Sequence, residues 1–325
     1  MAPTFPQRKI GNDSVSALGL GCMGMSFGYT SNGGYDEAES LKVLTRAADL
    51  GITFWDTSDI YGPFTNERLL GKWFAATGRR DEIFLATKFA NYFVDGEGMK
   101  VRGDAAYVKQ AIQDSLERLQ TDRVDLYYQH RVDPATPIEE TVQAMAELQA
   151  AGQIRHLGLS ECSARTLRRA CAVHPIAAAQ MEFSPFALEI ESGQTEFLAT
   201  ARELGVTIVA YSPLGRGFLT GAIRSRDDLD ATDSRFQHPR FSEEHFADNL
   251  RLVETLAGIA EEKGVHAGAA GVGVDFIPIP GTKRVKYLEE NAEAAKVELS
   301  REDEKRIRQA IESVGGSRGL GTRPR

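Results

Sequence analysis

Short apolar runs alternate with longer segments of helical spacing along this 325-residue chain, and the alternation limits the fold more than any other feature. Apolar runs rich in β-branched and aromatic residues are typical of strands that are buried on both faces. The expected strands cover residues 17–23, 53–58, 83–89, 124–130, 156–160, 177–183, 207–213 and 276–281. The expected helices between them cover residues 35–50, 105–119, 137–151, 163–173 and 192–204.

Strand–helix units that follow one another without a linker predict one closed (β/α)8 TIM barrel, with residues 1–325 as a single domain. Residues 8–16 (RKIGNDSVS) are expected to form a hairpin over the barrel floor, and a helix is expected near the C-terminus. Residues 215–249 are polar and are expected to form a large loop at the barrel mouth. An open doubly wound sheet is the alternative, because right-handed crossovers permit it as well.

The segment Gly19–Gly24 reads GLGCMG and formally matches the GxGxxG motif of dinucleotide-binding folds. That motif binds a pyrophosphate only where a helix begins immediately after the glycines. The residues that follow here, MSFGYTSNGG, are typical of a loop. We therefore interpret the segment as a glycine-rich strand end and not as a Rossmann motif.

Charge and cysteine usage exclude several classes of protein. The formal net charge is −8 and there is no basic run, which argues against a nucleic-acid partner. Cys22, Cys162 and Cys171 form neither a disulfide framework nor a metal-binding spacing, so we expect a reducing compartment and no metal. Because no apolar run has signal-peptide or membrane-spanning length, we expect a cytoplasmic protein without a membrane partner. The oligomeric state stays open.

Four polar residues fall at the ends of successive predicted strands or just after them. They are Asp56, Tyr61, Lys88 and His130. In an α/β barrel the carboxyl ends of all strands meet at one mouth, so these side chains should converge there. A lysine within an apolar strand is costly unless it is paired, and Asp56 is the natural partner of Lys88.

This set of residues suits carbonyl reduction, in which a hydride delivered to the carbonyl carbon leaves negative charge on the oxygen. Tyr61 would donate a proton to the carbonyl oxygen, Lys88 would lower the pKa of that phenol, and His130 would orient the oxygen. Taken one at a time, the residues have structural explanations as a turn residue, a packed aromatic, a salt-bridged strand end and a hydrogen-bonded histidine. Their joint occurrence at three strand ends favours an active site.

The D-x4-Y-G segment, the strand-end lysine and the QHRVD histidine resemble the catalytic tetrad of the aldo-keto reductases. The resemblance runs from about residue 8 to residue 311 through further segments: IRHLGLSE, VHPIAAAQMEFS, AYSPLGRGFLTG and PIPGTKRVKYLEEN. These segments are similar to the plant, fungal and bacterial branch that includes auxin-induced-protein-like, perakine-reductase-like and pyridoxal-reductase-like enzymes. The resemblance implies an NADPH-dependent reductase of small carbonyl compounds on a (β/α)8 barrel.

The same resemblance implies a cofactor site along the later strand ends. Its residues would be Ser160 and Gln180 for the carboxamide, Tyr211 for the nicotinamide ring, Ser212, Leu214, Gly215 and Arg216 for the pyrophosphate, Gly281, Thr282, Lys283 and Arg284 for the 2′-phosphate, and Glu290 and Asn291 for adenine. Two cations and a hydroxyl at a helix start suit a phosphate, although a solvated helix start is the alternative. The substrate would contact Met23, Tyr92 and Phe218, each of which could instead be a packing residue.

The chain departs from the family pattern after Val265. The glycine-rich stretch there is a poor helix and is about ten residues shorter than the pattern, which predicts a shortened seventh helix and a weaker outer layer. The alternative to an enzyme is a cofactor-sensing, weakly catalytic binding subunit of the same family. The complete tetrad favours the enzyme.

Overall fold

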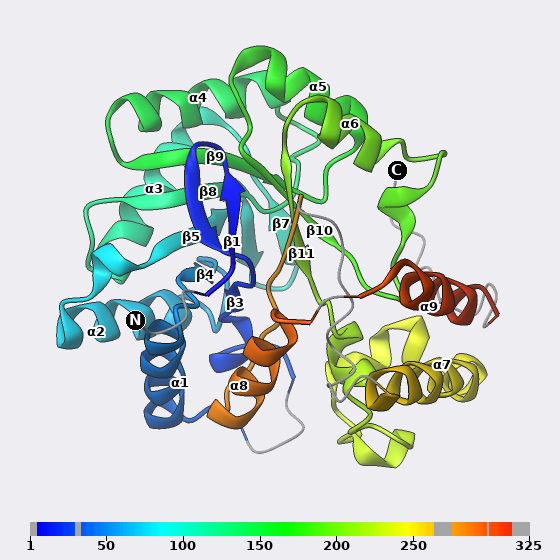
Figure 1. Ribbon diagram of the computed structural model, residues 1–325. Coiled ribbons are helices and arrows are strands. Elements are labelled where there is room, and N and C mark those ends of the chain that lie inside the picture. Colours follow the sequence, from blue (N-terminus) through cyan, green and yellow to red (C-terminus); the bar gives the residue numbers. More distant parts are fainter. Residues whose placement is uncertain (1–4, 30–33, 263–274, 298, 314–325) are drawn as a thin grey trace.

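The computed structural model describes residues 5–29, 34–262, 275–297 and 299–313. Eight parallel strands curl around a common axis, and helices cover the outside of the sheet (Figure 1). The strands are β3 Leu20–Gly21, β4 Phe54–Asp56, β5 Phe84–Phe89, β8 Val124–Gln129, β9 Ile154–Ser160, β10 Ala178–Glu182, β11 Thr207–Tyr211 and β12 Phe276–Pro278. They pair in their order along the chain. The (β/α)8 barrel is therefore confirmed, and the open doubly wound sheet is not observed.

The sheet closes where its first and last strands meet. Gly21 and Gly281 form a parallel bridge there. A Cβ atom on Gly21 would lie 2.7 Å from the Ile279 carbonyl oxygen, which is well inside contact distance. Closure of the barrel thus requires a residue without a side chain at this position.

The GLGCMG segment behaves as a strand end. A short 3-10 turn at Met23–Met25 follows it, and the first α-helix of the described residues begins only at Glu37. A dinucleotide fingerprint would need a helix directly after the glycines. The prediction that this segment is not a Rossmann motif is confirmed.

Alternation along the strands separates the barrel interior from the outer layer. Apolar residues that face the interior and pack together there include Phe54, Ala86, Tyr128, Ala178 and Val209. Because side chains alternate along a strand, the residues two positions further point into the barrel as well, at the carboxyl ends of the strands. Those residues are Asp56, Lys88, His130, Gln180 and Tyr211.

A hairpin closes the floor of the barrel, as the sequence predicts for residues 8–16. It consists of β1 (Gln7–Ile10) and β2 (Asp13–Ser16) in antiparallel register. Ile10 and Val15 belong to the apolar cluster of the barrel interior. The Ser16 hydroxyl accepts hydrogen bonds from the backbone of residues 53 and 54, each over 3.1 Å, and so joins the hairpin to β4.

Three of the helices begin at residues whose side chains cap them, and α1 ends at a glycine suited to that position. Their bounds are α1 Glu37–Leu50, α2 Thr65–Thr77, α3 Ala105–Leu119, α4 Ile138–Ala150, α5 Ala164–Val173, α6 Phe197–Glu203, α7 Glu243–Glu262, α8 Val285–Ala294 and α9 Arg301–Ser313. Asp36, Asp104 and Ser163 cap α1, α3 and α5 by accepting a backbone N–H of the first turn. Gly51 ends α1 in the left-handed conformation, with φ of 81°.

Several elements differ from the expected ones. The helix expected over residues 192–204 begins only at Phe197, after a 3-10 turn at Glu189–Glu191. The loop expected over residues 215–249 is a series of 3-10 turns that passes into α7 at Glu243. A second hairpin, β6 (Asn91–Val94) with β7 (Gly98–Val101), follows β5 and was not anticipated. The shortened helix predicted after residue 265 falls on residues 263–274, outside the described ones.

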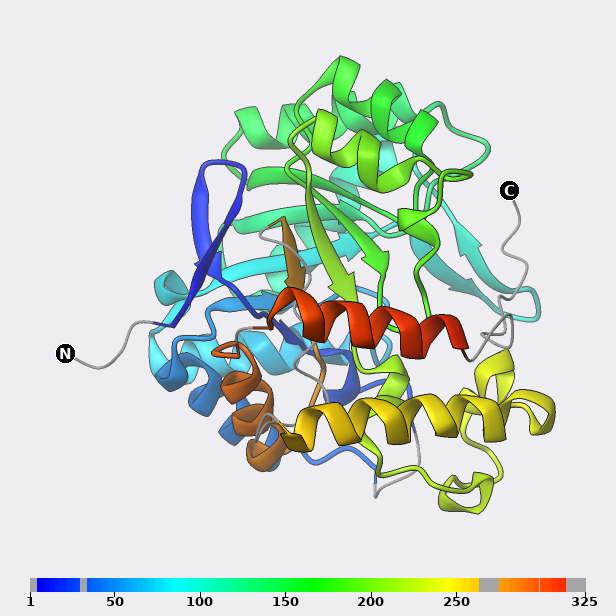
Figure 2. The same ribbon diagram turned by 45° about the vertical axis from the view of Figure 1, so that its right-hand side comes forward.

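Helices α7 and α9 lie side by side in both views of the ribbon (Figures 1 and 2). Their apolar faces meet through Phe246, Leu256 and Ile311. The same cluster contains Phe218 and Phe241 from the segment between β11 and α7. The polar segment at the mouth, residues 215–249, is therefore anchored by an apolar cluster separate from that of the barrel.

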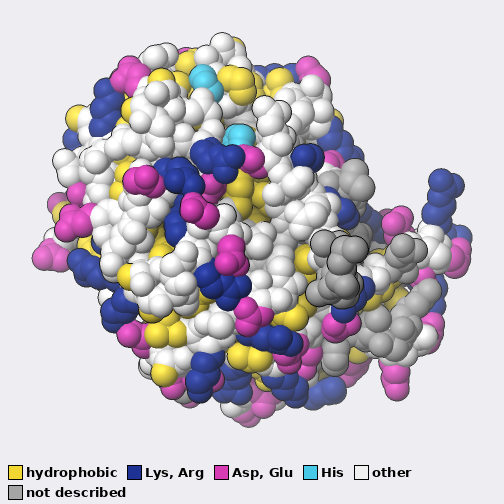
Figure 3. Space-filling view, turned by 60° about the vertical axis from the view of Figure 1, so that its left-hand side comes forward, with side chains coloured by type: hydrophobic (Ala, Val, Ile, Leu, Met, Phe, Trp, Pro, Cys, Tyr) yellow, Lys and Arg dark blue, Asp and Glu magenta, His cyan; other side chains and the backbone are white. Residues whose placement is uncertain are grey.

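The surface mixes charges of both signs. Lys and Arg side chains are interspersed with Asp and Glu over the face shown in Figure 3. None of the helices in the described ranges has the length and apolar character that a bilayer span requires. Within the same ranges, no cluster of three or more His, Cys, Asp or Glu residues is arranged to hold a metal ion.

Candidate active site

Asp56, Tyr61, Lys88 and His130 meet at the carboxyl ends of the strands. Lys88 Nζ lies 2.5 Å from Asp56 Oδ1 and 3.5 Å from the Tyr61 hydroxyl oxygen. The rings of Tyr61 and His130 meet edge to face with their centroids 6.0 Å apart. Residues separated by up to 74 positions in the sequence thus form one cluster, because the parallel strands end at one mouth.

The Lys88–Asp56 pair is fully enclosed. The Lys88 side chain is 0 % exposed and that of Asp56 is 3 % exposed. The ammonium also donates to the Thr57 carbonyl over 2.7 Å, and Gln180 Nε2 donates to the second Asp56 oxygen over 2.7 Å. Both charges therefore have hydrogen-bond partners in addition to one another, which a buried ion pair needs.

The pKa values of this pair show opposing influences. Burial raises the pKa of Asp56, although Lys88 and Gln180 work against that shift. Burial alone would lower the pKa of Lys88, but the neighbouring Asp56 and Tyr61 raise it overall. Lys88 is therefore an ammonium throughout the range in which proteins work.

The structure corrects one expectation about Tyr61. Burial raises the pKa of Tyr61 above its ordinary value, and this effect exceeds the lowering by Lys88 and Arg131. The predicted net lowering is therefore wrong, because sequence reasoning counted the nearby ammonium but not the loss of solvent around the phenol. A raised pKa keeps the phenol protonated, which is the form that a proton donor needs.

His130 directly follows β8 and contacts the Ser58 hydroxyl. Ser58 Oγ lies 3.2 Å from His130 Nδ1. Burial lowers the pKa of His130 well below its ordinary value, and the charges of Lys88 and Arg131 lower it further. The imidazole is therefore neutral near pH 7 and can orient an oxygen by donating one hydrogen bond.

The residues expected at the nicotinamide end lie on the next three strands. Ser160 ends β9 and Tyr211 ends β11, while Gln180 lies in β10 two residues before its end. Ser160 and Gln180 are buried at 1 % and 3 % exposure, and Tyr211 is partly exposed. These side chains are neighbours of the tetrad, as the Gln180–Asp56 hydrogen bond shows directly.

The segment expected to bind the pyrophosphate has an unusual backbone. Ser212, Gly215 and Arg216 have φ values of 52°, 57° and 62°, in the left-handed region that side chains rarely adopt. Leu214 precedes this turn, with φ of −94°. Strained backbone of this kind concentrates at ligand sites.

Arg216 itself has unused hydrogen-bonding capacity. Its Nη1 donates to the Tyr29 hydroxyl over 3.2 Å and its Nη2 lies 3.7 Å from Glu182 Oε2, while its Nε is buried without a hydrogen-bond partner in the described part of the chain. A buried guanidinium N–H is costly when it is unpaired. The residue therefore fits an anionic ligand such as a pyrophosphate.

A second cationic group lies at the start of α8. The Thr282 hydroxyl accepts from Arg284 N over 3.1 Å, and Gly281 forms the closing bridge of the barrel just before it. Lys283 donates to the Gly34 carbonyl over 2.5 Å, and neither Lys283 nor Arg284 has a carboxylate within 4.0 Å among the described residues. Two unneutralised cations at a helix N-terminus fit a phosphate group.

Further along α8 lie the two residues expected to contact adenine. Glu290 is 3.8 Å from Lys286 Nζ, and Asn291 follows it. Both are partly exposed. They share the helix that carries the cationic pair at its N-terminus, so a nucleotide running along α8 could reach both groups.

The three residues expected to contact substrate have different surroundings. Met23 is partly exposed in the turn after β3. Tyr92 lies on the β6–β7 hairpin with its ring centroid 6.0 Å from that of Tyr107. Phe218 is 0 % exposed and stacks on Phe241 with centroids 5.1 Å apart, so packing alone accounts for it. Contact with substrate stays a prediction for all three.

The structure reveals polar groups that the sequence reasoning missed. Ser58 and Asp59 are buried within the D-x4-Y-G segment, where the spacing of the motif drew attention only to its aspartate and its tyrosine. Arg131 Nη1 donates to the Ser160 hydroxyl over 3.3 Å. Arg240 binds Glu182 over 2.7 Å and so ties the mouth segment to β10, a contact between residues 58 positions apart that no local pattern indicates.

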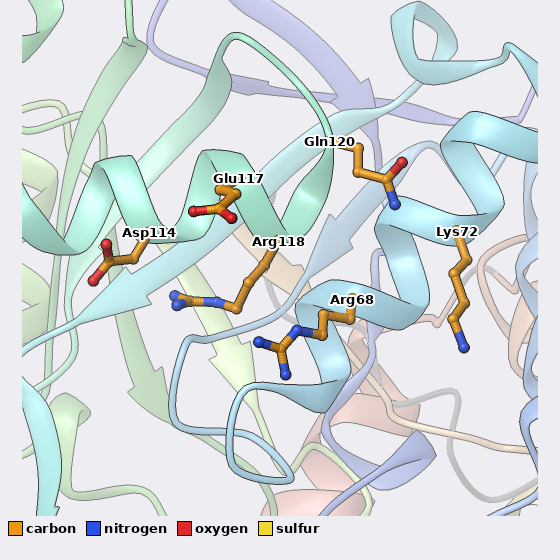
Figure 4. A pocket seen from close by; sticks show the side chains of 6 residues that line it. All are labelled: Arg68, Lys72, Asp114, Glu117, Arg118 and Gln120. Carbon is orange, nitrogen blue, oxygen red and sulfur yellow. The ribbon is translucent and has the colours of Figure 1, made fainter.

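A groove on the outer layer is lined by charged and amide side chains. Figure 4 shows its lining side chains on α2, on α3 and at the end of α3: Arg68, Lys72, Asp114, Glu117, Arg118 and Gln120. Lys72 pairs with Glu37, and Arg118 pairs with the buried Glu67. The groove lies among the helices of the outer layer, away from the mouth, and holds none of the tetrad.

Comparison with known proteins places the chain in a family. Residues 17–312 match the model of the aldo/keto reductase family. The chain is 49 % identical over 318 residues to the aldo-keto reductase yakc [NADP(+)] of Schizosaccharomyces pombe, covering 96 % of this chain and 93 % of that protein. It is 50 % identical over 317 residues to the aldo-keto reductase str7 of Strobilurus tenacellus, covering 95 % and 92 %.

The fold agrees with a solved structure at lower identity. The glycerol dehydrogenase AKR11B4 from Gluconobacter oxydans superposes with a TM-score of 0.84 at 24 % identity, covering 100 % of this chain and 98 % of that one. At this level of identity the match supports the fold alone. Together with the family match over residues 17–312 and the two relatives at about half identity, it leads to one conclusion: this chain belongs to the aldo/keto reductase family.

Proposed function

We propose that this protein reduces an aldehyde or ketone to the corresponding alcohol with NADPH, and catalyses the reverse oxidation as well. The observation that carries the proposal is the buried cluster in which Lys88 Nζ lies 2.5 Å from Asp56 and 3.5 Å from the Tyr61 hydroxyl. The cofactor assignment is supported by the NADP(+) in the name of the S. pombe relative and by Lys283 and Arg284, which have no carboxylate partner among the described residues.

The residues of the cluster have complementary tasks. Bound nicotinamide would supply a hydride to the carbonyl carbon, so that the π electrons of the carbonyl bond pass to its oxygen. Tyr61 gives its proton to that oxygen, and the alcohol is complete. The phenolate left behind is stabilised by Lys88, whose charge is held in place by Asp56.

His130 acts on the same oxygen without giving up a proton. As a neutral imidazole it can donate one hydrogen bond to the carbonyl oxygen, which fixes the orientation of the substrate and stabilises the charge that develops on it. Burial and the Lys88 and Arg131 charges hold the pKa of His130 well below its ordinary value, so it does not compete with Tyr61 as the proton donor.

The cofactor would be held by chain segments that surround the mouth. Ser160 and Gln180 would bind the carboxamide, and Tyr211 would stack on the nicotinamide ring. Ser212, Leu214, Gly215 and Arg216 would surround the pyrophosphate. Gly281, Thr282, Lys283 and Arg284 would bind the 2′-phosphate, and Glu290 with Asn291 would contact adenine.

The test is a screen of NADPH oxidation over aromatic aldehydes, short aldehydes, pyridoxal and bulky cyclic ketones. We expect turnover with at least one class and binding of NADPH that can be followed by its fluorescence. Tight binding of NADPH without turnover on any class would support a cofactor-sensing subunit in place of an enzyme. Failure to bind NADPH would overturn the cofactor assignment itself.

A further inference from the structure

A buried pair next to the tetrad has no place in the mechanism described so far. Ser58 is 0 % exposed and Asp59 is 4 % exposed, and both lie on the turn between β4 and Tyr61. The turn is fixed to β5 by two backbone hydrogen bonds, from Thr57 N to Ala86 O over 2.9 Å and from Asp59 N to Lys88 O over 3.2 Å. The two side chains are therefore held in a constant relation to the reacting residues.

The pair forms a chain of polar contacts that ends on the catalytic imidazole. Ser58 Oγ lies 3.2 Å from His130 Nδ1 and 3.1 Å from Asp59 Oδ1. Ile60 N also donates to Asp59 Oδ1, over 2.6 Å. His130 Nε2 makes no hydrogen bond to the part of the protein that the structure describes, so it is the nitrogen left for a substrate.

The Ser58 hydroxyl has one proton and two acceptors, and the choice between them decides the state of His130. If Asp59 is ionised, the hydroxyl donates to the carboxylate and must accept a hydrogen bond from Nδ1–H. A neutral imidazole has only one N–H, so Nε2 would then be bare. If Asp59 is protonated, it donates to Ser58, Ser58 donates to Nδ1, and the proton of the imidazole lies on Nε2.

Only the second arrangement can serve carbonyl reduction. A carbonyl oxygen needs a hydrogen-bond donor, and a bare Nε2 would present a lone pair to it. We propose, on the basis of the function proposed above, that Ser58 and Asp59 are positioning residues that select the His130 tautomer carrying its proton on Nε2. Asp59 acts in this role as a carboxylic acid.

The surroundings of Asp59 favour that protonated form. Burial raises the pKa of Asp59 to about 8, and the negative charge of Glu67 on α2 contributes to the rise. The hydrogen bonds with Ser58 and Ile60 oppose the rise, and so does the charge of Arg118 on α3, which is bound to Glu67 over 2.6 Å; burial outweighs all three. The other titratable groups that face Asp59 are Tyr107 on α3 and Tyr127 on β8, and burial raises the pKa of both phenols, so they stay neutral.

The direct test is the tautomer of His130, observed by long-range ¹H–¹⁵N NMR on histidine-labelled protein. The signals of His130, one of six histidines, are identified by their loss in His130→Gln. We expect the Nε2–H form in the wild type at pH 6.5 and a shift towards the Nδ1–H form above about pH 8. Asp59→Asn should hold a single His130 tautomer at every pH, because an amide does not titrate.

Kinetics give a second readout. Ser58→Ala should lower kcat by about tenfold or more with little change in the KM for NADPH. Without the hydroxyl, the proton of His130 is no longer kept on Nε2, where it would donate to the carbonyl oxygen. Ser58→Thr should restore most of the loss because it keeps the hydroxyl. Asp59→Asn should remove the fall in kcat above pH 8 that the wild type is expected to show.

Ser40→Ala is the matched control, because the Ser40 hydroxyl is buried in α1 and donates to the residue that caps the same helix, to Asp36 O over 2.8 Å. It should change neither the tautomer nor kcat. A wild-type His130 with its proton on Nδ1 at pH 6.5, or a Ser58→Ala protein with an unchanged tautomer and pH profile, would overturn the proposal. The NMR result needs no substrate, so it stands or falls independently of whether the protein reduces carbonyl compounds.

Discussion

Lys88 donates from its buried ammonium to Asp56 over 2.5 Å, and both side chains are enclosed, so that solvent cannot take the place of either partner. Each charge is tolerable only because its partner is present, since an unpaired charge in such a place costs far more than the pair does. The ammonium needed beside Tyr61 is thus maintained by a carboxylate that does not itself touch the phenol.

Removal of one member of this pair should therefore damage stability as well as activity. Lys88→Met leaves Asp56 buried without its partner and should lower the free energy of unfolding by roughly 3–5 kcal/mol. Lys88→Met combined with Asp56→Asn removes both charges and should be less destabilised than Lys88→Met alone. Urea denaturation of the two variants checks this order. A single variant at least as stable as the double variant would contradict it.

Tyr61→Phe should abolish most turnover while NADPH binding persists. Loss of the proton donor should lower kcat by about 10²- to 10⁴-fold, because the oxygen of the product then takes its proton from elsewhere. Tyr127→Phe is the matched control, since the Tyr127 hydroxyl is buried in the core without a hydrogen-bond partner among the described residues. Steady-state kinetics and NADPH fluorescence titration measure both effects, and equal kcat values for the two variants would refute the role of Tyr61.

Lys283→Ala should weaken NADPH far more than NADH. The lysine has no carboxylate partner in the described structure, so the 2′-phosphate would be its counter-charge. We expect the KM for NADPH to rise by about tenfold or more, and the KM for NADH to change little. Lys296→Ala, just beyond the far end of α8 and already paired with Glu293, is the control and should affect neither. Equal effects of Lys283→Ala on both cofactors would exclude a contact with the 2′-phosphate.

Gly21→Ala should destabilise the barrel where it closes. The added methyl group would lie 2.7 Å from the Ile279 carbonyl oxygen, so the first and last strands would have to separate. A cost of roughly 1–3 kcal/mol is expected, as for other overpacked positions. Gly24→Ala adds the same methyl group where no atom lies within 4 Å and should cost much less. Thermal unfolding of both variants makes the comparison, and equal losses would show that closure does not depend on Gly21.

Asp59 should make the protein less stable as the pH rises, which is opposite to the usual effect of a carboxylate. Its pKa is about 8 in the folded protein and 3.8 in the unfolded reference, so between these values the folded state holds the extra proton. Its contribution to stability is present at pH below 3.8 and is lost as the pH rises towards 8. Because Asn does not titrate, Asp59→Asn should gain stability relative to the wild type as the pH rises.

The control for this pH dependence is Asp122→Asn, which removes a carboxylate whose side chain is 86 % exposed. Its stability relative to the wild type should not vary with pH over the same range. Urea denaturation from pH 5 to pH 9 measures both differences. A difference for Asp59→Asn that is constant with pH would show that Asp59 is ionised throughout.

Local pattern was sufficient for the barrel and for the identity of its candidate catalytic groups. Buried strands need continuous apolar runs, and each of the eight expected runs overlaps a strand of the barrel, although β9 begins two residues before its run. The carboxyl ends of the strands of such a barrel meet at one mouth, so Asp56, Lys88 and His130 could be assigned there before any coordinates. Helix α2 and the β6–β7 hairpin went unassigned because weak periodicity does not distinguish them from loops.

Burial and long-range contact, in contrast, were decided only by the tertiary structure. The sequence places an ammonium near Tyr61 but does not say how much water the phenol loses, and that loss reverses the direction of its pKa shift. It places Ser58 and Asp59 in a familiar segment but not within 3.2 Å of an imidazole 72 positions away. Charges and hydrogen bonds depend on distance and dielectric, which arise only when separate strands come together.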